Sequence, residues 1–136
     1  MGTGSGRQDD PWILKTPSLG SDYQAWHDTT TGQLVCQVGT TRLAYHWRCI
    51  EDLADMLKQR GDWVLLGNAD EGKPVVAGSV EGWARDESNP VGGYYGIRKG
   101  YRGRFANHVP PVMERLGLAE VEHGPRGNRM RHGSGV

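Results

Sequence analysis

The sequence has few of the features that identify a chemistry from residue types alone. Its two cysteines, Cys36 and Cys49, match no zinc or redox spacing, and we expect buried free thiols. None of its five histidines stands at metal-ligand spacing to another, no serine lies in a nucleophile-elbow sequence, and the GxxxxGK phosphate-binding pattern is missing. We therefore predict no catalytic residue, no metal site and no cofactor, which favours a binding role without excluding an enzyme.

Long hydrophobic runs are missing as well. Hydrophobic residues make up 36% of the 136-residue chain, and no run approaches the length of a membrane span. The first residues, MGTGSGRQDD, lack the apolar core of a secretory signal, so we expect a cytoplasmic protein. Their Gly, Ser and Asp content predicts a disordered tail over residues 1–10, followed by a single α+β domain over residues 11–132.

Alternating apolar residues predict three strands in the first part of this domain, at Tyr23–Asp28, Gln33–Val38 and Thr41–Trp47. Short turns join them, so we expect a small antiparallel meander. From Ile50 to Arg60 the apolar residues recur at helical spacing, acids stand at the start and bases at the end, and Gly61 follows. We predict a helix there that covers one face of the meander.

Two shorter elements follow in the middle of the chain. The apolar run Trp63–Leu66 predicts a short buried strand, and Ser79 is placed to cap a short helix over Val80–Asp86. We place the boundary between two structural halves, residues 11–75 and 76–132, between these elements.

Charge is distributed unevenly, although the formal net charge is zero. Residues 1–95 carry 8 basic and 13 acidic side chains, a balance of −5, and residues 96–136 carry 8 basic and 3 acidic, a balance of +5. This asymmetry indicates either a polyanionic partner or attraction between the two halves of the protein. Within the basic part, Tyr94–His132 has the order basic loop, helix, glycine stop, apolar strand, turn and basic strand, which is typical of a winged-helix DNA-binding half.

The helix of this basic half, Phe105–Leu116, contains Pro110 and Pro111, so it either kinks after its first turn or begins at the prolines. Gly117 then ends it. The last hairpin is expected to have a register that pairs apolar with apolar residues and acids with bases. The predicted pairs are Val121 with Met130, Glu122 with Arg129, and Glu120 with Arg131.

The basic half supplies the candidate nucleic-acid contacts. Its glycine-rich loop would let the backbone approach a phosphate, its cations would neutralise that phosphate, and its tyrosine would stack on a base or donate a hydrogen bond. Residues at the front of the helix are of types that read base edges, and the hairpin tip would act as the wing. The candidates are Arg98, Lys99, Tyr101, Arg102, Arg104, Asn107, His108, Arg126, Arg129 and Arg131. In the alternative, an acid among Asp70, Glu71, Asp86 and Glu87 folds over the loop and occupies its arginines.

The chain resembles a family of small uncharacterised proteins from actinobacteria and their phages. Four stretches carry this resemblance: GDW at 61–63, NPVGG at 89–93, RKGYRGRF at 98–105 and LGLAEVEH at 116–123. That resemblance spans about residues 11–131 and implies no activity. Separately, the helix, the Leu-Gly-Leu stop and the basic hairpin resemble the end of winged-helix regulators, which implies DNA binding. The double proline departs from the usual recognition helix.

The sequence thus predicts an α+β fold: a small antiparallel meander covered by a helix, then a winged-helix-like basic half ending in a β-hairpin. The function we expect is binding of double-stranded DNA, as a transcriptional regulator or a factor associated with phages or mobile elements. A homodimer is left open, and no membrane association is expected. The alternatives are a protein-interaction or assembly module that docks on an acidic partner, and an enzyme with a glycine-rich site near residues 92–103.

Overall fold

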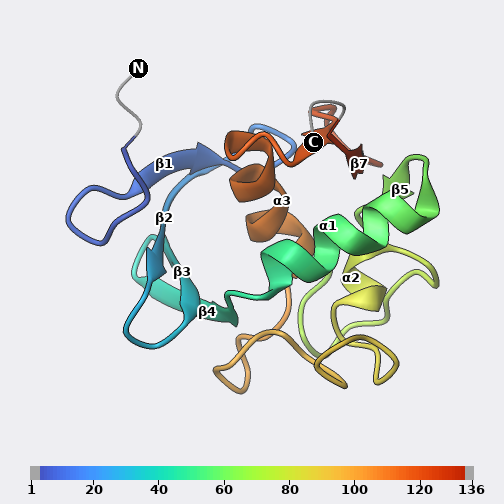
Figure 1. Cartoon of the computed structure of the whole chain (residues 1–136), viewed down its shortest axis with the longest axis horizontal. Coiled ribbons are helices and arrows are strands. Elements are labelled where there is room, and N and C mark those ends of the chain that lie inside the picture. Colours follow the sequence, from blue (N-terminus) through green and yellow to red (C-terminus); the bar gives the residue numbers. More distant parts are fainter. Residues whose placement is uncertain (1–3, 134–136) are drawn as a thin grey trace.

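The computed structural model describes residues 4–133, which form two antiparallel sheets with helices between them (Figure 1). The first sheet is a meander in the order β1-β2-β3-β4. Its strands are β1 (Trp12–Lys15), β2 (Asp22–Asp28), β3 (Gln33–Val38) and β4 (Thr41–His46). The three predicted strands are confirmed, and β1 is an additional one. Four residues are too few for alternation to be recognised, although Trp12 and Leu14 are buried and Ile13 is exposed.

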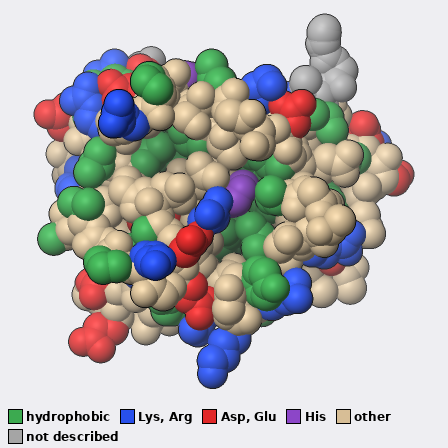
Figure 2. Space-filling model, turned by 180° about the vertical axis from the view of Figure 1, so that it is seen from behind, with side chains coloured by type: hydrophobic (Ala, Val, Ile, Leu, Met, Phe, Trp, Pro, Cys, Tyr) green, Lys and Arg blue, Asp and Glu red, His purple; other side chains and the backbone are tan. Residues whose placement is uncertain are grey.

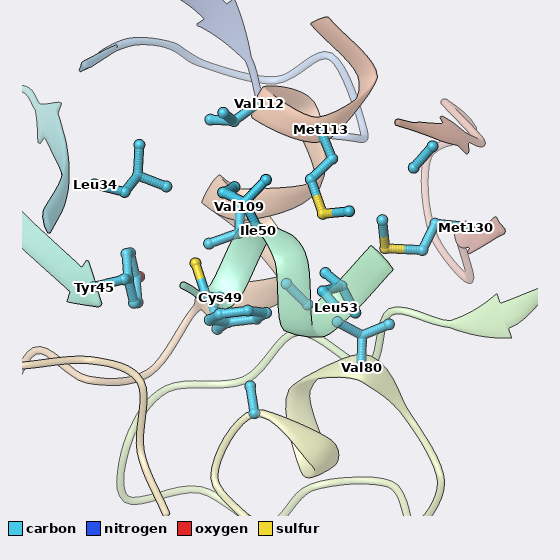
Figure 3. Packing of buried hydrophobic residues seen from close by; sticks show 14 of the residues in the cluster. Leu34, Tyr45, Cys49, Ile50, Leu53, Val80, Val109, Val112, Met113 and Met130 are labelled. Carbon is cyan, nitrogen blue, oxygen red and sulfur yellow. The ribbon is translucent and has the colours of Figure 1, made fainter. Parts of the chain in front are cut away.

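Helix α1 (Cys49–Arg60) confirms the predicted helix and ends at Gly61, whose φ of 69° is the left-handed conformation that glycine adopts at low cost. Its position differs from the prediction. The helix starts beside the meander but runs away from it and packs on the second sheet, against β7 (Arg129–His132) (Figure 1). Its first turn, with Cys49 and Ile50, lies near Tyr45 of the meander (Figure 3).

The second half follows the order helix, strand, helix, helix, strand, strand from α1 onward. After α1 come β5 (Val64–Leu65), α2 (Val80–Trp83), α3 (Phe105–Arg115), β6 (Ala119–Val121) and β7. The three short strands pair in the order β5-β7-β6. Ser79 caps α2 as predicted, with its Oγ accepting a hydrogen bond from Gly82 N at 3.1 Å, but the helix ends at Trp83 rather than at the predicted Asp86.

Helix α3 runs through both prolines without ending, which settles the alternative that the sequence left open. Its start is held by a carboxylate from another element. Glu81 of α2 is 1% exposed and accepts hydrogen bonds from Phe105 N at 3.3 Å and Ala106 N at 2.9 Å. The helix ends in a Schellman motif, because Leu118 N donates to Met113 O and Gly117 N to Glu114 O.

The register of the last hairpin is the predicted one. Val121 pairs with Met130 and Glu120 with Arg131. Glu122 N donates to Arg129 O at 2.9 Å, which continues the same register toward the turn. Pairing of apolar with apolar residues and of acids with bases therefore favours the same strand register.

One hydrophobic core joins both halves (Figure 3). Helix α3 contacts both β6 of the second sheet and β1 of the first, so it links the two sheets. The predicted disorder over residues 1–10 does not extend to residues 4–10: Gly6 is buried, and its carbonyl accepts a hydrogen bond from His27 N at 2.9 Å. The part of that prediction concerning residues 1–3 lies outside the described residues.

Candidate nucleic-acid interface

The glycine-rich loop is folded back onto the segment Ala69–Lys73. The Glu71 carboxylate accepts hydrogen bonds from Gly100 N at 3.0 Å, from Arg102 N at 2.8 Å, and from Nε and Nη2 of Arg102 at 2.9 and 3.0 Å. The Arg102 side chain is the main reason why the pKa of Glu71 is lowered to about 2, and the backbone N–H groups add to it. Arg102 is therefore committed to an acid of its own chain.

Arg104 is paired in the same way. Its Nε meets the Asp70 carboxylate, its backbone N donates to Ala69 O at 2.8 Å, and its φ of 57° is unusual for a residue other than glycine. Arg85 fixes the facing segment by donating to the carbonyl oxygens of Ala69, Asp70, Glu71 and Lys73. In the structure, Asp70 and Glu71 therefore neutralise the loop arginines Arg104 and Arg102, as the alternative expected. Asp86 and Glu87 form no ion pair within residues 4–133.

Two glycines of the loop allow close backbone approaches, one of them to the segment Ala69–Lys73. A Cβ on Gly103 would lie 2.2 Å from Glu71 N, and one on Gly96 would lie 2.6 Å from Arg102 Cα. Only glycine allows the backbone to approach so closely at these two positions. The close approach predicted for a phosphate is made here by the chain itself.

The two hairpin arginines are paired as well. Arg129 Nη2 lies 2.6 Å from Glu122 Oε2, and Arg131 Nη2 lies 3.0 Å from Glu120 Oε1. Both guanidinium groups also lie over the Trp63 ring, at 5.2 and 4.5 Å from its centroid. These contacts leave the arginines partly exposed but reduce the positive charge that they offer to a phosphate.

Of the residues expected to read base edges, His108 is buried, whereas Asn107 is half-buried and Arg104 is exposed. His108 is 2% exposed, its ring meets the edge of Tyr23 at 4.9 Å, and its backbone carbonyl accepts a hydrogen bond from the Tyr23 hydroxyl at 2.6 Å. Burial lowers the pKa of His108 to about 4. Tyr23 of the meander therefore covers the His108 ring, and the expectation that His108 lies exposed at the front of the helix is wrong.

The remaining candidates are accessible. Arg98, Lys99, Tyr101 and Arg126 are exposed, and none of the three cations forms an ion pair within the described part of the chain. Arg98 lies 4.1 Å from the centroid of the Tyr101 ring and donates to Arg42 O at 3.4 Å. The face in Figure 2 shows acidic side chains beside basic ones rather than one continuous basic patch.

Two hollows bring some of these residues together. One, of about 380 Å³, is lined by Asn107 and Arg126 together with Leu66, Gly67 and Asn68, which follow β5. The other, of about 320 Å³, is lined by Tyr101, Arg104 and His108. Glu81, which accepts hydrogen bonds from the start of α3, and Asp70 and Glu71, which pair with the loop arginines, were not among the predicted site residues. The signal available for them was acidic charge upstream of a basic loop, which indicated Asp70 and Glu71 but not Glu81.

Fold and surface together define a small α+β protein in which a meander joins a helix-and-hairpin half and most arginines of the basic half are paired internally. The chain belongs to a family of unknown function (DUF6855), whose model matches residues 4–133. The expected membership of an uncharacterised family is therefore confirmed. Searches of curated proteins and of solved structures gave no match.

Two further findings concern the described residues alone. No helix within residues 4–133 is both long enough and apolar enough to cross a membrane. Within the same range, no three side chains of His, Cys, Asp or Glu converge as metal ligands. Cys36 and Cys49 are free and fully buried, and burial raises the pKa of both thiols.

Proposed function

We propose that this protein binds double-stranded DNA through its phosphate backbone, using the loop around Arg98 and Lys99 and the hairpin tip at Arg126. The observation that carries the proposal is the chain order from α1 to β7 combined with the strand order β5-β7-β6. A winged-helix domain has this order, and its wing is the hairpin that here carries Arg126. The source of the family in actinobacteria and phages stays a prediction.

This mode of binding differs from that of a helix inserted in the major groove. Since the His108 ring is buried against Tyr23 and Arg104 is paired with Asp70, contacts from this helix to base edges are left out, and phosphate contacts carry little sequence information. With three cations available, log K should fall with log salt concentration at a slope of about −3, and the affinity should lie in the range of about 10⁻⁴ to 10⁻⁶ M at physiological salt. A non-specific DNA-associated factor fits this better than a sequence-specific regulator.

The test is fluorescence anisotropy with a labelled duplex over a series of salt concentrations. Changing Arg98, Lys99 and Arg126 to Ala together should flatten the salt slope by about 0.9 for each phosphate that is no longer neutralised. The matched control changes Lys58, Arg60 and Lys73 to Ala, three exposed cations outside these loops that form no ion pair within residues 4–133. Equal slopes for the triple variant and the native protein, or no binding at low salt, would refute the proposal.

A second candidate is docking on an acidic protein. The observation that favours it is the pair of exposed apolar side chains, Ile97 at 38% and Tyr101 at 41%, beside Arg98 and Lys99. Tyrosine and arginine dominate protein-interface hot spots. In this case an acidic protein recovered from a pull-down would lose binding when Tyr101 or Ile97 is changed to Ala, whereas duplex DNA would not be bound by the native protein at low salt.

A further inference from the structure

The hollow at the foot of the glycine-rich loop has features of a ligand site. It measures about 320 Å³ and lies between the end of the β3–β4 hairpin, the loop 100–104, the segment at Asp70 and the first turns of α3. Val38 and Leu43 give it apolar walls, and Thr41 adds a hydroxyl. Small-molecule sites combine apolar walls with a few polar groups in this way.

A largely buried histidine lies in its wall. His108 lines the hollow and is 2% exposed; its Nδ1 is buried and lacks a well-formed hydrogen bond within residues 4–133, although the Arg104 backbone lies near enough to the ring to oppose the lowering of its pKa. Buried polar groups are nearly always satisfied, and an unsatisfied one costs free energy. Because its pKa is lowered to about 4, the ring is neutral at pH 7, with one nitrogen able to donate and the other to accept.

The charges around the hollow neutralise one another. Asp70 is paired with Arg104, and Glu71 with Arg102, so neither sign is in excess inside it. Tyr101, 41% exposed, lies in its lining; the Arg98 guanidinium lies over its ring at 4.1 Å from the centroid, so a base would stack on the opposite face. An uncharged, planar ring with donors and acceptors on its edge matches this combination better than an aliphatic chain or an ion does.

We propose that this hollow binds a nucleobase, with Tyr101 stacking on the ring and Thr41 and His108 meeting its polar edge. The base comes either from a free nucleotide or from an unpaired position in a single strand. Arg98, which lies 4.1 Å from the Tyr101 ring centroid, is placed to meet the phosphate attached to that base. Binding of an unpaired base in a single-stranded nucleic acid rests on the proposed nucleic-acid binding, whereas binding of a free nucleotide in this hollow does not.

The experiment follows NMR amide shifts of the full chain during titration with uncharged nucleosides at high salt, where phosphate contacts play no part. At least one nucleoside should shift amides of residues lining the hollow in a saturable manner. Tyr101→Ala should weaken that binding by at least about fivefold, the lower end of base–aromatic stacking. Thr41→Val should weaken it as well. Leu116→Ala, at another exposed apolar side chain, serves as the matched control and should leave it unchanged.

Nucleoside 5′-monophosphates and a short single strand then separate the two sources. Tighter binding of the strand than of its mononucleotide identifies an unpaired base as the ligand, and equal binding identifies a free nucleotide. No saturable shift in the hollow with any nucleoside, or equal affinity in Tyr101→Ala, would overturn the inference. Fully paired duplex offers no free base, so failure here leaves the duplex-binding proposal untouched, and failure of duplex binding leaves the pocket untouched.

Discussion

Replacing Glu81 with alanine tests how the helical half of the protein is held together. The carboxylate is 1% exposed and has three donors: Arg85 Nη2 at 2.7 Å, Ala106 N at 2.9 Å and Phe105 N at 3.3 Å. Burial raises the pKa of Glu81, while the N–H donors and Arg85 favour its ionised form. The substitution removes the acceptor for the first N–H groups of α3. It also leaves the guanidinium group of Arg85, whose side chain is 11% exposed, without its counterion.

The expected cost follows from these hydrogen bonds. Removing one partner of a buried ion pair costs about 3–5 kcal/mol, and this range includes the uncompensated charge that remains. A chain of this size has a total stability of about 5–15 kcal/mol, so the loss is a large fraction of it. The melting temperature should fall by roughly 10–15 °C.

Urea unfolding followed by circular dichroism measures the effect, with Glu87→Ala as control because Glu87 is exposed and forms no ion pair within residues 4–133. The control should stay within about 0.5 kcal/mol of the native protein. Glu81→Gln should fall between the two, since its amide oxygen can still accept from the helix N–H groups but carries no charge. A loss below about 1 kcal/mol for Glu81→Ala would show that water or another group replaces the carboxylate, and the reasoning would be refuted.

Three other outcomes are expected. The pKa of His108 is about 4 in the folded protein against 6.5 for a free histidine, so between these pH values the unfolded state binds more protons. The contribution of His108 to stability is therefore complete above pH 6.5 and falls by up to about 3 kcal/mol as the pH drops toward 4. His108→Gln should flatten this part of a profile of urea midpoint against pH. Gly103→Ala should cost about 1–3 kcal/mol by the same unfolding assay, because its Cβ meets backbone atoms, and an unchanged midpoint would contradict the close approach. Glu122→Arg should cost a few tenths to about 1 kcal/mol by repelling Arg129, and a stabilised hairpin would contradict the register.

Local signals in the sequence were sufficient for much of the fold. Periodicity located the meander strands and α1, and the hairpin register followed from matching Glu120 and Glu122 with Arg131 and Arg129. These elements depend on residues that are close in sequence or lie on one face of one element. The packing of α1 against the second sheet could not be predicted from the sequence, because an apolar stripe shows that a helix face is buried but not which element buries it.

The site was harder to predict because its main interactions join residues far apart in sequence. Glu81 and Ala106 are separated by 25 positions, and Glu71 and Arg102 by 31. No spacing rule connects such pairs, since they meet only after α2 and α3 have packed. The same holds for His108, whose residue type suits base reading but whose ring is covered by Tyr23, 85 positions away.

The charge imbalance of the sequence is therefore a weaker indicator of nucleic-acid binding than its size suggested. Of the basic side chains after residue 95, Arg102, Arg104, Arg129 and Arg131 are each paired with an acid, two of these acids coming from the first half and two from the hairpin itself. Pairing of this kind stabilises the loop and the hairpin while removing much of the field that would attract a phosphate. What distinguishes a binding surface is the set of cations left without a partner, and in residues 4–133 Arg98, Lys99 and Arg126 are such cations on the loop and the hairpin tip. Because Tyr23 of the meander covers the His108 ring, the proposed nucleic-acid binding would rest on these cations rather than on base reading by α3.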